Sequence, residues 1–377
     1  IGQIPLTRDR PLAIVANDEG ALVAKATRGQ IVVVHCRTVA LPFRSNSVTH
    51  ARLESINPAT GESLGDLAAA TPESARDAVA RARAAQPSWG ELRARDRARV
   101  LRRLRDVVIE HFDEIAASER RETGKPLTEA ASTTLAVADM CGYFAALAVQ
   151  WERGRRVSSG PLLGKRGRIH VRPLGVAAVI SPWNYPFHLA MLQIVPALAA
   201  GNAVVHKPSE HTPRTGLLIG ELCRLAGVPE SVVQVVVGDG AIGRVIIDAG
   251  VNVIAFTGAP STGRRVMEAA AQHLTPVLLE LGGKDAAIVC DDADLERAAN
   301  GITWGAFINA GQTCIAVKRA IVAESVYDRF VAMIAERART LRPSADDNAQ
   351  MGALTLAHEV ERLERQITTS VNLGARL

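Results

Sequence analysis

The chain is poor in several residue types, and each scarcity argues against a class of protein. Its five cysteines are scattered, odd in number and form no C-x-x-C pair, which argues against a disulfide framework or a zinc site and for a reducing compartment. Aromatic residues make up only 4% of the sequence, and the arginine clusters at 93–105 and 151–168 have no aromatics placed to stack on bases. We therefore expect no metal site and no nucleic-acid partner.

Long uninterrupted apolar runs are also missing. The apolar stretches at 135–151 and 185–205 contain charged or polar residues or proline, so we expect neither to span a bilayer. Residues 1–30 carry charges throughout, which is not the pattern of a secretory signal. The sequence thus favours a cytoplasmic protein without a membrane partner.

What is present is the composition of an ordinary globular chain. The 377 residues are 47% hydrophobic and 22% charged, which is enough for two domains with their own cores. Thr71 and Pro72 are typical of a helix N-cap and a first helical position, and helical periodicity runs through 93–121 and 128–151. Residues 155–173, rich in glycine and β-formers, predict a projecting hairpin.

Short β-forming runs then alternate with helical segments. The predicted strands of this part of the chain lie at 176–180, 203–206, 232–237 and 253–256. Strands of nearly pure Val, Ile and Ala between helices indicate an α/β fold with a parallel sheet covered on both faces. A second α/β region begins near residue 282. Because such sheets bind ligands at the carboxyl ends of their strands, we expect the chemical motifs to follow strands.

Two glycine-rich segments carry a candidate nucleophile and a candidate base. Cys314 ends the run NAGQTC, and Glu280 lies in the run LELGGK. A thiol that attacks a carbonyl needs open space around its sulfur and a nearby proton acceptor, and glycine lets the backbone come close to a substrate. Taken alone, each residue also has a plainer interpretation, Cys314 as a small buried apolar residue and Glu280 as a solvated carboxylate.

Three further segments have the residue types of an oxyanion site and a cofactor site. Two prolines stiffen the loop SPWNYPF, so that Asn184 can direct an amide N–H at a developing oxyanion. In the run KPSE, Lys207 and Glu210 can hold a ribose between them. The run FTGAPSTG, which ends at Gly263, offers helix-start N–H groups to a pyrophosphate. Taken alone, each segment also has a plainer interpretation. SPWNYPF could be a proline-rich turn, KPSE a surface ion pair and FTGAPSTG an ordinary turn between a strand and a helix.

Together these segments resemble the aldehyde dehydrogenase superfamily. The resemblance covers about residues 55–365, and five co-linear motifs are specific evidence. The motifs occur in the family's order and at about its spacing: PWN (182–184), KPSE (207–210), FTG…G (256–263), ELGGK (280–284) and GQTC (311–314).

The resemblance implies oxidation of an aldehyde to a carboxylic acid, with hydride transfer to NAD or, alternatively, NADP. Cys314 would form a thiohemiacetal, Asn184 and the Cys314 N–H would hold the oxyanion, and Glu280 would activate the water that hydrolyses the thioester. Lys207 and Glu210 would hold the adenine ribose. The other cofactor-binding residues that it implies are Trp183, Ser209, Gly258, Ala259, Gly263 and Leu281.

Two of these positions affect how the cofactor would bind. Glu210 puts a negative charge where the 2′-phosphate of NADP would lie, so we predict a preference for NAD. Ala259 and Pro260 replace hydroxyl residues that the family often has after the first glycine. Each hydrogen bond lost there would cost about 0.5–1.5 kcal/mol of cofactor binding.

The resemblance also implies a domain order. Residues 55–154 and 174–281 would form an NAD-binding domain, 155–173 an oligomerisation hairpin and 282–377 part of a catalytic domain, while 1–54 have no assignment. The chain begins with Ile, and the family continues past the end of this chain with a Glu-x-Phe-Gly-Pro segment. We therefore expect an incomplete catalytic domain, and a homo-oligomer for the full-length protein.

Three hypotheses remain open at this point. The first is an active aldehyde dehydrogenase of the hydrolytic kind. The second is a truncated, non-catalytic remnant that binds a dinucleotide or another subunit. The third is a relative that acylates coenzyme A, which Glu280 disfavours because a carboxylate in the base position favours hydrolysis.

Overall fold

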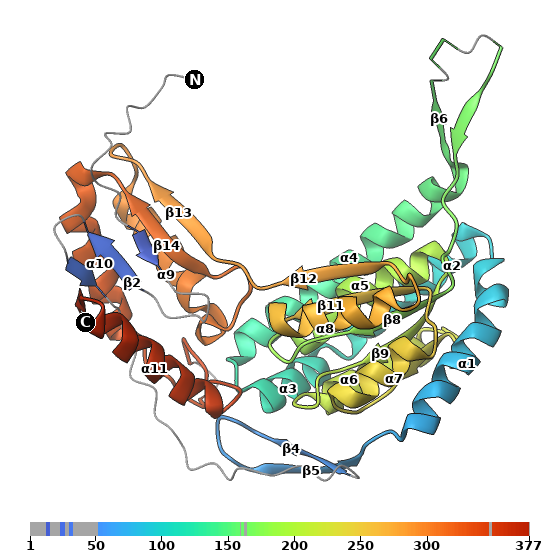
Figure 1. The fold of residues 1–377 in the computed structure, drawn as a ribbon, viewed down its shortest axis with the longest axis horizontal. Helices are drawn as coiled ribbons and strands as arrows, with labels where there is room; N and C mark the ends of the chain where they lie inside the picture. The colour runs from blue at the N-terminus through green and yellow to red at the C-terminus, as the bar shows by residue number, and fades with distance from the viewer. Residues whose placement is uncertain are drawn as a thin grey trace.

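The protein consists of two α/β units, which lie side by side in Figure 1. One unit is built on a five-stranded sheet and the other on a two-stranded sheet, and both sheets are parallel. The predicted α/β class with two parallel sheets is confirmed. The computed structural model describes residues 13–15, 23–26, 30–32, 52–158, 160–161, 164–346 and 349–376.

The larger sheet has the strand order β10-β9-β8-β11-β12. Its strands are β8 (Val176–Ile180), β9 (Ala203–Lys207), β10 (Val233–Val235), β11 (Val253–Gly258) and β12 (Val277–Leu281). Every residue of β8 and β9 is buried, as the apolar runs predicted. The chain order reverses between β8 and β11, and the crevice beyond the carboxyl ends of two such strands is the usual ligand site of an open α/β sheet.

Helices cover both faces of this sheet. Right-handed crossovers place α5 (Pro186–Ala200) and α6 (Pro213–Leu225) on one face, and α7 (Gly240–Asp248) and α8 (Pro260–Ala271) on the other. Helix α1 (Pro72–Gly90) packs beside α7. It begins as predicted, because the Thr71 hydroxyl accepts a hydrogen bond from the Ser74 N–H at 3.2 Å.

A layer of three further helices backs α5 and α6. They are α2 (Ala94–Glu110), α3 (Phe112–Thr123) and α4 (Leu127–Arg153). The helical periodicity predicted over 93–121 corresponds to two helices, α2 and α3. The chain leaves helical geometry at His111 (φ −103°, ψ 21°), which ends α2 and starts α3, so that each helix can turn its own apolar face to the core.

Helix α4 is also long and apolar enough, by length and composition alone, to cross a membrane. In this molecule it packs against α2, α3 and α5 and buries Val137, Cys141 and Ala145. We therefore assign it to the helical core of the larger unit. The predicted hairpin follows it, with β6 (Arg155–Val157) and β7 (Gly167–Ile169) paired antiparallel and projecting from the body (Figure 1).

The second unit is smaller. Strands β13 (Asp285–Val289) and β14 (Val317–Val322) are joined through α9 (Leu295–Phe307) and the short helix η1 (Ile308–Gly311). Val289, Leu295, Ala299, Ala320 and Phe330 belong to its core. The remaining elements in the described part of the chain are β4 (Arg52–Ile56), β5 (Ser63–Ala68), η2 (Glu324–Val326), α10 (Tyr327–Thr340), α11 (His358–Asn372), and a sheet of β1 (Ala13–Val15), β2 (Val23–Ala26), β3 (Gln30–Val32) and β15 (Ala375–Arg376).

Candidate active site

The two glycine-rich segments that carry the candidate nucleophile and base meet in the structure. The Gly283 N–H donates to the carbonyl oxygen of Cys314 at 3.1 Å. A methyl group on Gly283 would stand 2.8 Å from that same oxygen, so the close approach depends on glycine. Glu280, three positions earlier, is exposed on the edge strand β12. The backbone therefore brings the strand of Glu280 to the loop of Cys314.

Two of the motif segments do not follow a strand, contrary to expectation. Glu280 lies within β12, opposite Thr257 of β11. Cys314 follows α9 and η1 and precedes β14. It lies in the loop that joins the crossover helix α9 to β14, so a helix and not a strand comes before it. Cys314 is half-buried and its thiol is free. The segments of Asn184 and Lys207 do lie at the carboxyl ends of β8 and β9.

The turn before Cys314 is conformationally strained. Asn309 (φ 52°), Ala310 (φ 54°) and Gly311 (φ 76°) are all left-handed, and each non-glycine residue in that region costs roughly 1–3 kcal/mol. Hydrogen bonds hold the turn from within its own unit. The Gln312 side-chain amide donates to the Asn309 carbonyl at 2.9 Å, and Lys318 Nζ donates to the Gly311 carbonyl at 3.0 Å.

Asn184 is tied to this same turn. Its Nδ2 donates to the Gln312 carbonyl at 2.9 Å, which leaves a second amide hydrogen for a ligand oxygen. The Asn309 Nδ2 donates in turn to the backbone carbonyl of Asn184 at 3.0 Å. The candidate oxyanion donor and the candidate nucleophile thus share one hydrogen-bonded network.

The buried ion pair of Lys125 and Glu119 joins this network through the backbone of Asn184. Lys125 is 1% exposed, and its Nζ donates to a Glu119 carboxylate oxygen and to the Asn184 carbonyl, the latter at 2.8 Å. The ammonium also lies 4.0 Å from the centre of the Tyr185 ring, a cation–π contact. Burial raises the pKa of Tyr185 to about 12, so its hydroxyl stays protonated beside the Thr313 hydroxyl, 2.8 Å away.

Sequence reasoning missed Lys125 and Glu129 as parts of this site. Glu129, in the first turn of α4, accepts the Asn309 N–H at 2.9 Å. Burial raises the pKa of Glu129, against the opposing effects of the Asn309 N–H and Lys125. The sequence cue that could have indicated Lys125 was its place directly after Gly124. In the structure Gly124 is left-handed (φ 74°) and ends α3. A charged residue at a tight junction between two helices is a candidate for a buried role.

The predicted ribose-binding pair is present at the end of β9. Lys207 is buried, and its Nζ donates to the carbonyls of Pro208 and Gly238 at 2.7 Å each. It lies 3.6 Å from the Glu210 carboxylate, while the Ser209 hydroxyl accepts the His211 N–H at 3.3 Å. Burial lowers the pKa of Lys207, and Glu210 opposes that shift.

The predicted pyrophosphate segment lies at the end of β11. A methyl group on Gly258 would meet the Phe256 ring at 2.6 Å, and one on Gly263 would meet Leu281 at 2.9 Å. Ala259 gives α8 no side-chain cap, so the start of the helix stays open to an anion. Trp183, next to Asn184 after β8, is half-buried.

These residues together fit a dinucleotide. They lie on β8, β9 and β11 and in the segments that follow these strands, at the same edge of the sheet. This edge includes the point where the strand order reverses, and it combines an uncapped helix start with an amine–carboxylate pair. Leu281, at the end of the neighbouring strand β12, packs on Gly263 and closes this side.

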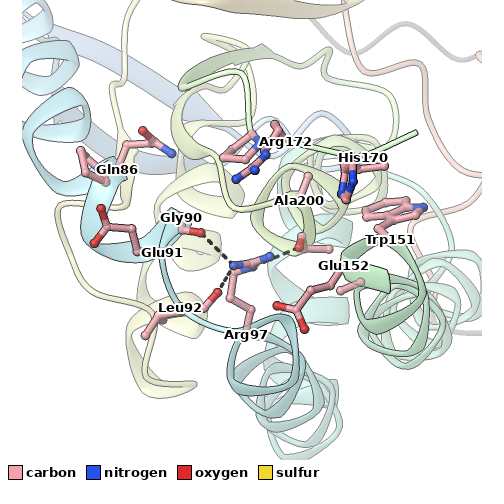
Figure 2. A pocket seen from close by; sticks show the side chains of 15 residues that line it. Gln86, Gly90, Glu91, Leu92, Arg97, Trp151, Glu152, His170, Arg172 and Ala200 are labelled. Carbon is pink, nitrogen blue, oxygen red and sulfur yellow. Dashed lines mark hydrogen bonds between the residues drawn. The ribbon is translucent and has the colours of Figure 1, made fainter. Parts of the chain in front are cut away.

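A cavity of about 610 Å³ lies elsewhere in the larger unit (Figure 2). It is formed where the C-terminal ends of α1, α4 and α5 meet the start of α2 and the segment after β7. The buried Arg97 donates there to the carbonyls of Gly90, Leu92 and Ala199. None of the predicted site residues lines this cavity, so it is separate from the candidate active site.

Comparison with known proteins gives a consistent family assignment. The family described as "Aldehyde dehydrogenase family" matches residues 44–377. The chain is 37% identical over 327 residues to the 4,4'-diapolycopene aldehyde oxidase of Methylomonas sp, and the match covers 86% of this chain and 62% of that protein.

Comparison with solved structures supports the same family assignment. An NADP dependent enzyme of E. coli matches with a TM-score of 0.81 and 36% identity over 85% of this chain and 67% of that one. A betaine aldehyde dehydrogenase of Staphylococcus aureus, solved in complex with NAD+, matches with a TM-score of 0.79 and 32% identity over 86% of this chain and 65% of that one.

The chain therefore spans about 62% of the length of the curated relative. The matched range includes the whole of both parallel sheets and every candidate site residue. The resemblance carried by the five motifs is confirmed, and the chain belongs to the aldehyde dehydrogenase family.

Proposed function

We propose that the protein oxidises an aldehyde to a carboxylic acid and transfers the hydride to NAD. The observation that carries the proposal is the hydrogen bond between the Gly283 N–H and the Cys314 carbonyl. It joins the strand of a candidate base to the loop of a candidate nucleophile. Family membership supports the same chemistry, and the relatives include one enzyme described as NADP dependent and one solved with NAD+.

Cys314 begins the reaction as the nucleophile. Its thiolate sulfur forms a bond to the aldehyde carbon, and the electron pair of the carbonyl double bond moves to oxygen. The free amide hydrogen of Asn184 and the Cys314 N–H stabilise that oxyanion. When bound, NAD would supply the acceptor for the hydride that leaves the same carbon. The carbon–oxygen double bond re-forms, which leaves a thioester on Cys314.

Glu280 acts in the second half of the reaction. Its carboxylate takes a proton from a water molecule, whose oxygen attacks the thioester carbon. The bond to sulfur breaks, the carboxylic acid is released, and Cys314 returns as a thiolate. Glu280 is exposed on an edge strand, which gives it access to water.

Separate groups would hold the two ends of the cofactor. Lys207 and Glu210 would hold the adenine ribose, with Ser209 between them in the chain. The start of α8, from Gly258 to Gly263, would face the pyrophosphate. Trp183 and Leu281 would line the nicotinamide side. We further propose a homo-oligomer, because among the described residues the projecting hairpin (Figure 1) pairs β6 only with β7, which leaves its outer edges available to another strand. We also propose a cytoplasmic location, because scattered cysteines without a C-x-x-C pair favour a reducing compartment.

The test is aldehyde-dependent formation of NADH by this 377-residue chain. A panel with a short hydroxyaldehyde, a quaternary-ammonium aldehyde and a long apolar aldehyde covers different substrate chemistries. We expect NADH with at least one of them, and loss of the signal in Cys314→Ala. Binding of NAD without NADH formation from any aldehyde would contradict the proposal and favour a non-catalytic, dinucleotide-binding chain.

A separate product analysis addresses the fate of the thioester. We expect the free carboxylic acid with or without coenzyme A in the reaction. Formation of an acyl-coenzyme A at the expense of the acid would contradict the role given to Glu280.

A further inference from the structure

The turn that precedes Cys314 requires support from outside itself. Asn309, Ala310 and Gly311 are left-handed in succession, and only the last is a glycine, the residue that adopts this conformation without steric cost. Strained backbone of this kind persists only where surrounding contacts hold it. Within the second unit, the side chains of Gln312 and Lys318 donate hydrogen bonds to carbonyl oxygens of the turn. The N–H of Asn309 finds its acceptor in another element.

That element is the first turn of α4 in the larger unit. Glu129 Oε2 accepts the Asn309 N–H at 2.9 Å, across a separation of 180 positions in the chain. A carboxylate in the first turn of a helix is favoured by the helix dipole, and Glu129 is the acidic residue of that turn. Asn309 is 1% exposed, so no water replaces this acceptor easily and an unpaired N–H there would be costly.

The contact has consequences beyond the turn. The Asn309 side chain donates to the carbonyls of Asn184 and Gln312, and the Asn184 carbonyl also receives Lys125 Nζ. If the backbone of Asn309 moved, the loop of Asn184 and the residues before Cys314 would lose a shared donor. The position of Asn309 therefore sets the position of both catalytic groups.

We propose that Glu129 is a positioning residue, whose carboxylate holds the left-handed turn at Asn309 so that Cys314 and Asn184 keep a common geometry. The proposal rests on the proposed function for its catalytic consequence. The hold on the turn can be measured without that function, by hydrogen exchange.

The first measurement is hydrogen–deuterium exchange by mass spectrometry. In Glu129→Ala we expect the peptide that covers residues 308–314 to exchange at least about tenfold faster, because its buried N–H loses its acceptor. In Glu129→Gln the amide oxygen still accepts the bond, so exchange returns toward the wild-type rate. Asp139→Asn, which removes an exposed carboxylate from the same helix, is the matched control and should leave this peptide unchanged.

The second measurement separates kcat from KM. Glu129→Ala should lower kcat by about 10- to 100-fold, the usual effect of a small misplacement of reacting groups, with KM for NAD unchanged within about twofold. Ala310→Gly in the Glu129→Ala background should recover part of kcat, because glycine removes the strain at that position. A uniform loss of protection and a lower melting temperature would instead indicate general destabilisation and contradict the proposal.

The two measurements also distinguish failure of this proposal from failure of the proposed function. If Glu129→Ala leaves exchange at residues 308–314 at the wild-type rate, the positioning role is wrong, whatever the activity. If the wild-type chain does not oxidise aldehydes, the proposed function is wrong. Exchange in Glu129→Ala then still decides whether the carboxylate holds the turn.

Discussion

The predicted preference for NAD depends on a single carboxylate. Glu210 lies 3.6 Å from Lys207 Nζ and keeps 38% of its side chain exposed, so its charge is only partly compensated. A 2′-phosphate bound beside Lys207 would meet that charge, whereas the 2′-hydroxyl of NAD can donate a hydrogen bond to it. Among the relatives, one is described as NADP dependent and another was solved with NAD+.

We predict that Glu210→Gln shifts this preference toward NADP. Two unit charges about 4 Å apart interact by about 1 kcal/mol in water, so the ratio of kcat/KM for NADP to that for NAD should rise about five- to tenfold. Steady-state kinetics with both cofactors measure the ratio. A wild-type enzyme that already works much better with NADP would show that the charge of Glu210 does not act in this way.

The candidate reactive residues could be predicted from the sequence, whereas the residues that contact and hold their loops could not. Cys314, Glu280 and Asn184 stand in short runs whose residue types are informative by themselves. Lys125 and Glu129 form hydrogen bonds with partners 59 and 180 positions away, and no local sequence pattern predicts contacts between residues so far apart in the chain. A lysine and a glutamate near a helix start are read from sequence as solvated groups, and only the fold shows that Lys125 is buried.

Among the elements, the strands and helices of the larger sheet were the most predictable. Apolar runs of β8 and β9 and the cap at Thr71 are local signals, and the structure has them where they were expected. The break at His111 was missed because the periodicity of α2 continues into α3. Strand β12 was missed because Glu280 interrupts its short apolar sequence VLLEL, and its burial alternates at a sheet edge.

The junction between β12 and the Cys314 loop offers a test at the level of elements. In Gly283→Ala the added methyl would stand 2.8 Å from the Cys314 carbonyl oxygen, whereas a methyl on Gly282 would meet nothing within 4 Å. We predict that Gly283→Ala lowers the free energy of unfolding by about 1–3 kcal/mol, and that Gly282→Ala changes it by less than about 0.5 kcal/mol. Chemical denaturation of both variants is the measurement. Equal stability of the two would mean that these segments do not meet as described.

At the scale of the whole molecule, the two units differ in the size of their buried apolar cores. The larger unit encloses an extensive apolar core. In the second unit, Ile288, Trp304 and Ile315 are 74%, 67% and 71% exposed, so three large apolar side chains of this unit face solvent in the structure. The chain spans about 62% of the curated relative, so its activity and assembly have to be measured on the chain itself.

The central claim is that Cys314 and Glu280 serve one reaction in one site. The most direct measurement is mass spectrometry of Glu280→Gln after incubation with an aldehyde and NAD. On this account the variant forms the thioester but lacks the base that hydrolyses it, so we predict an acyl adduct on the peptide that contains Cys314, at a higher level than in the wild type. Release of NADH without any adduct on Cys314, or an adduct on the exposed Cys290 instead, would contradict it.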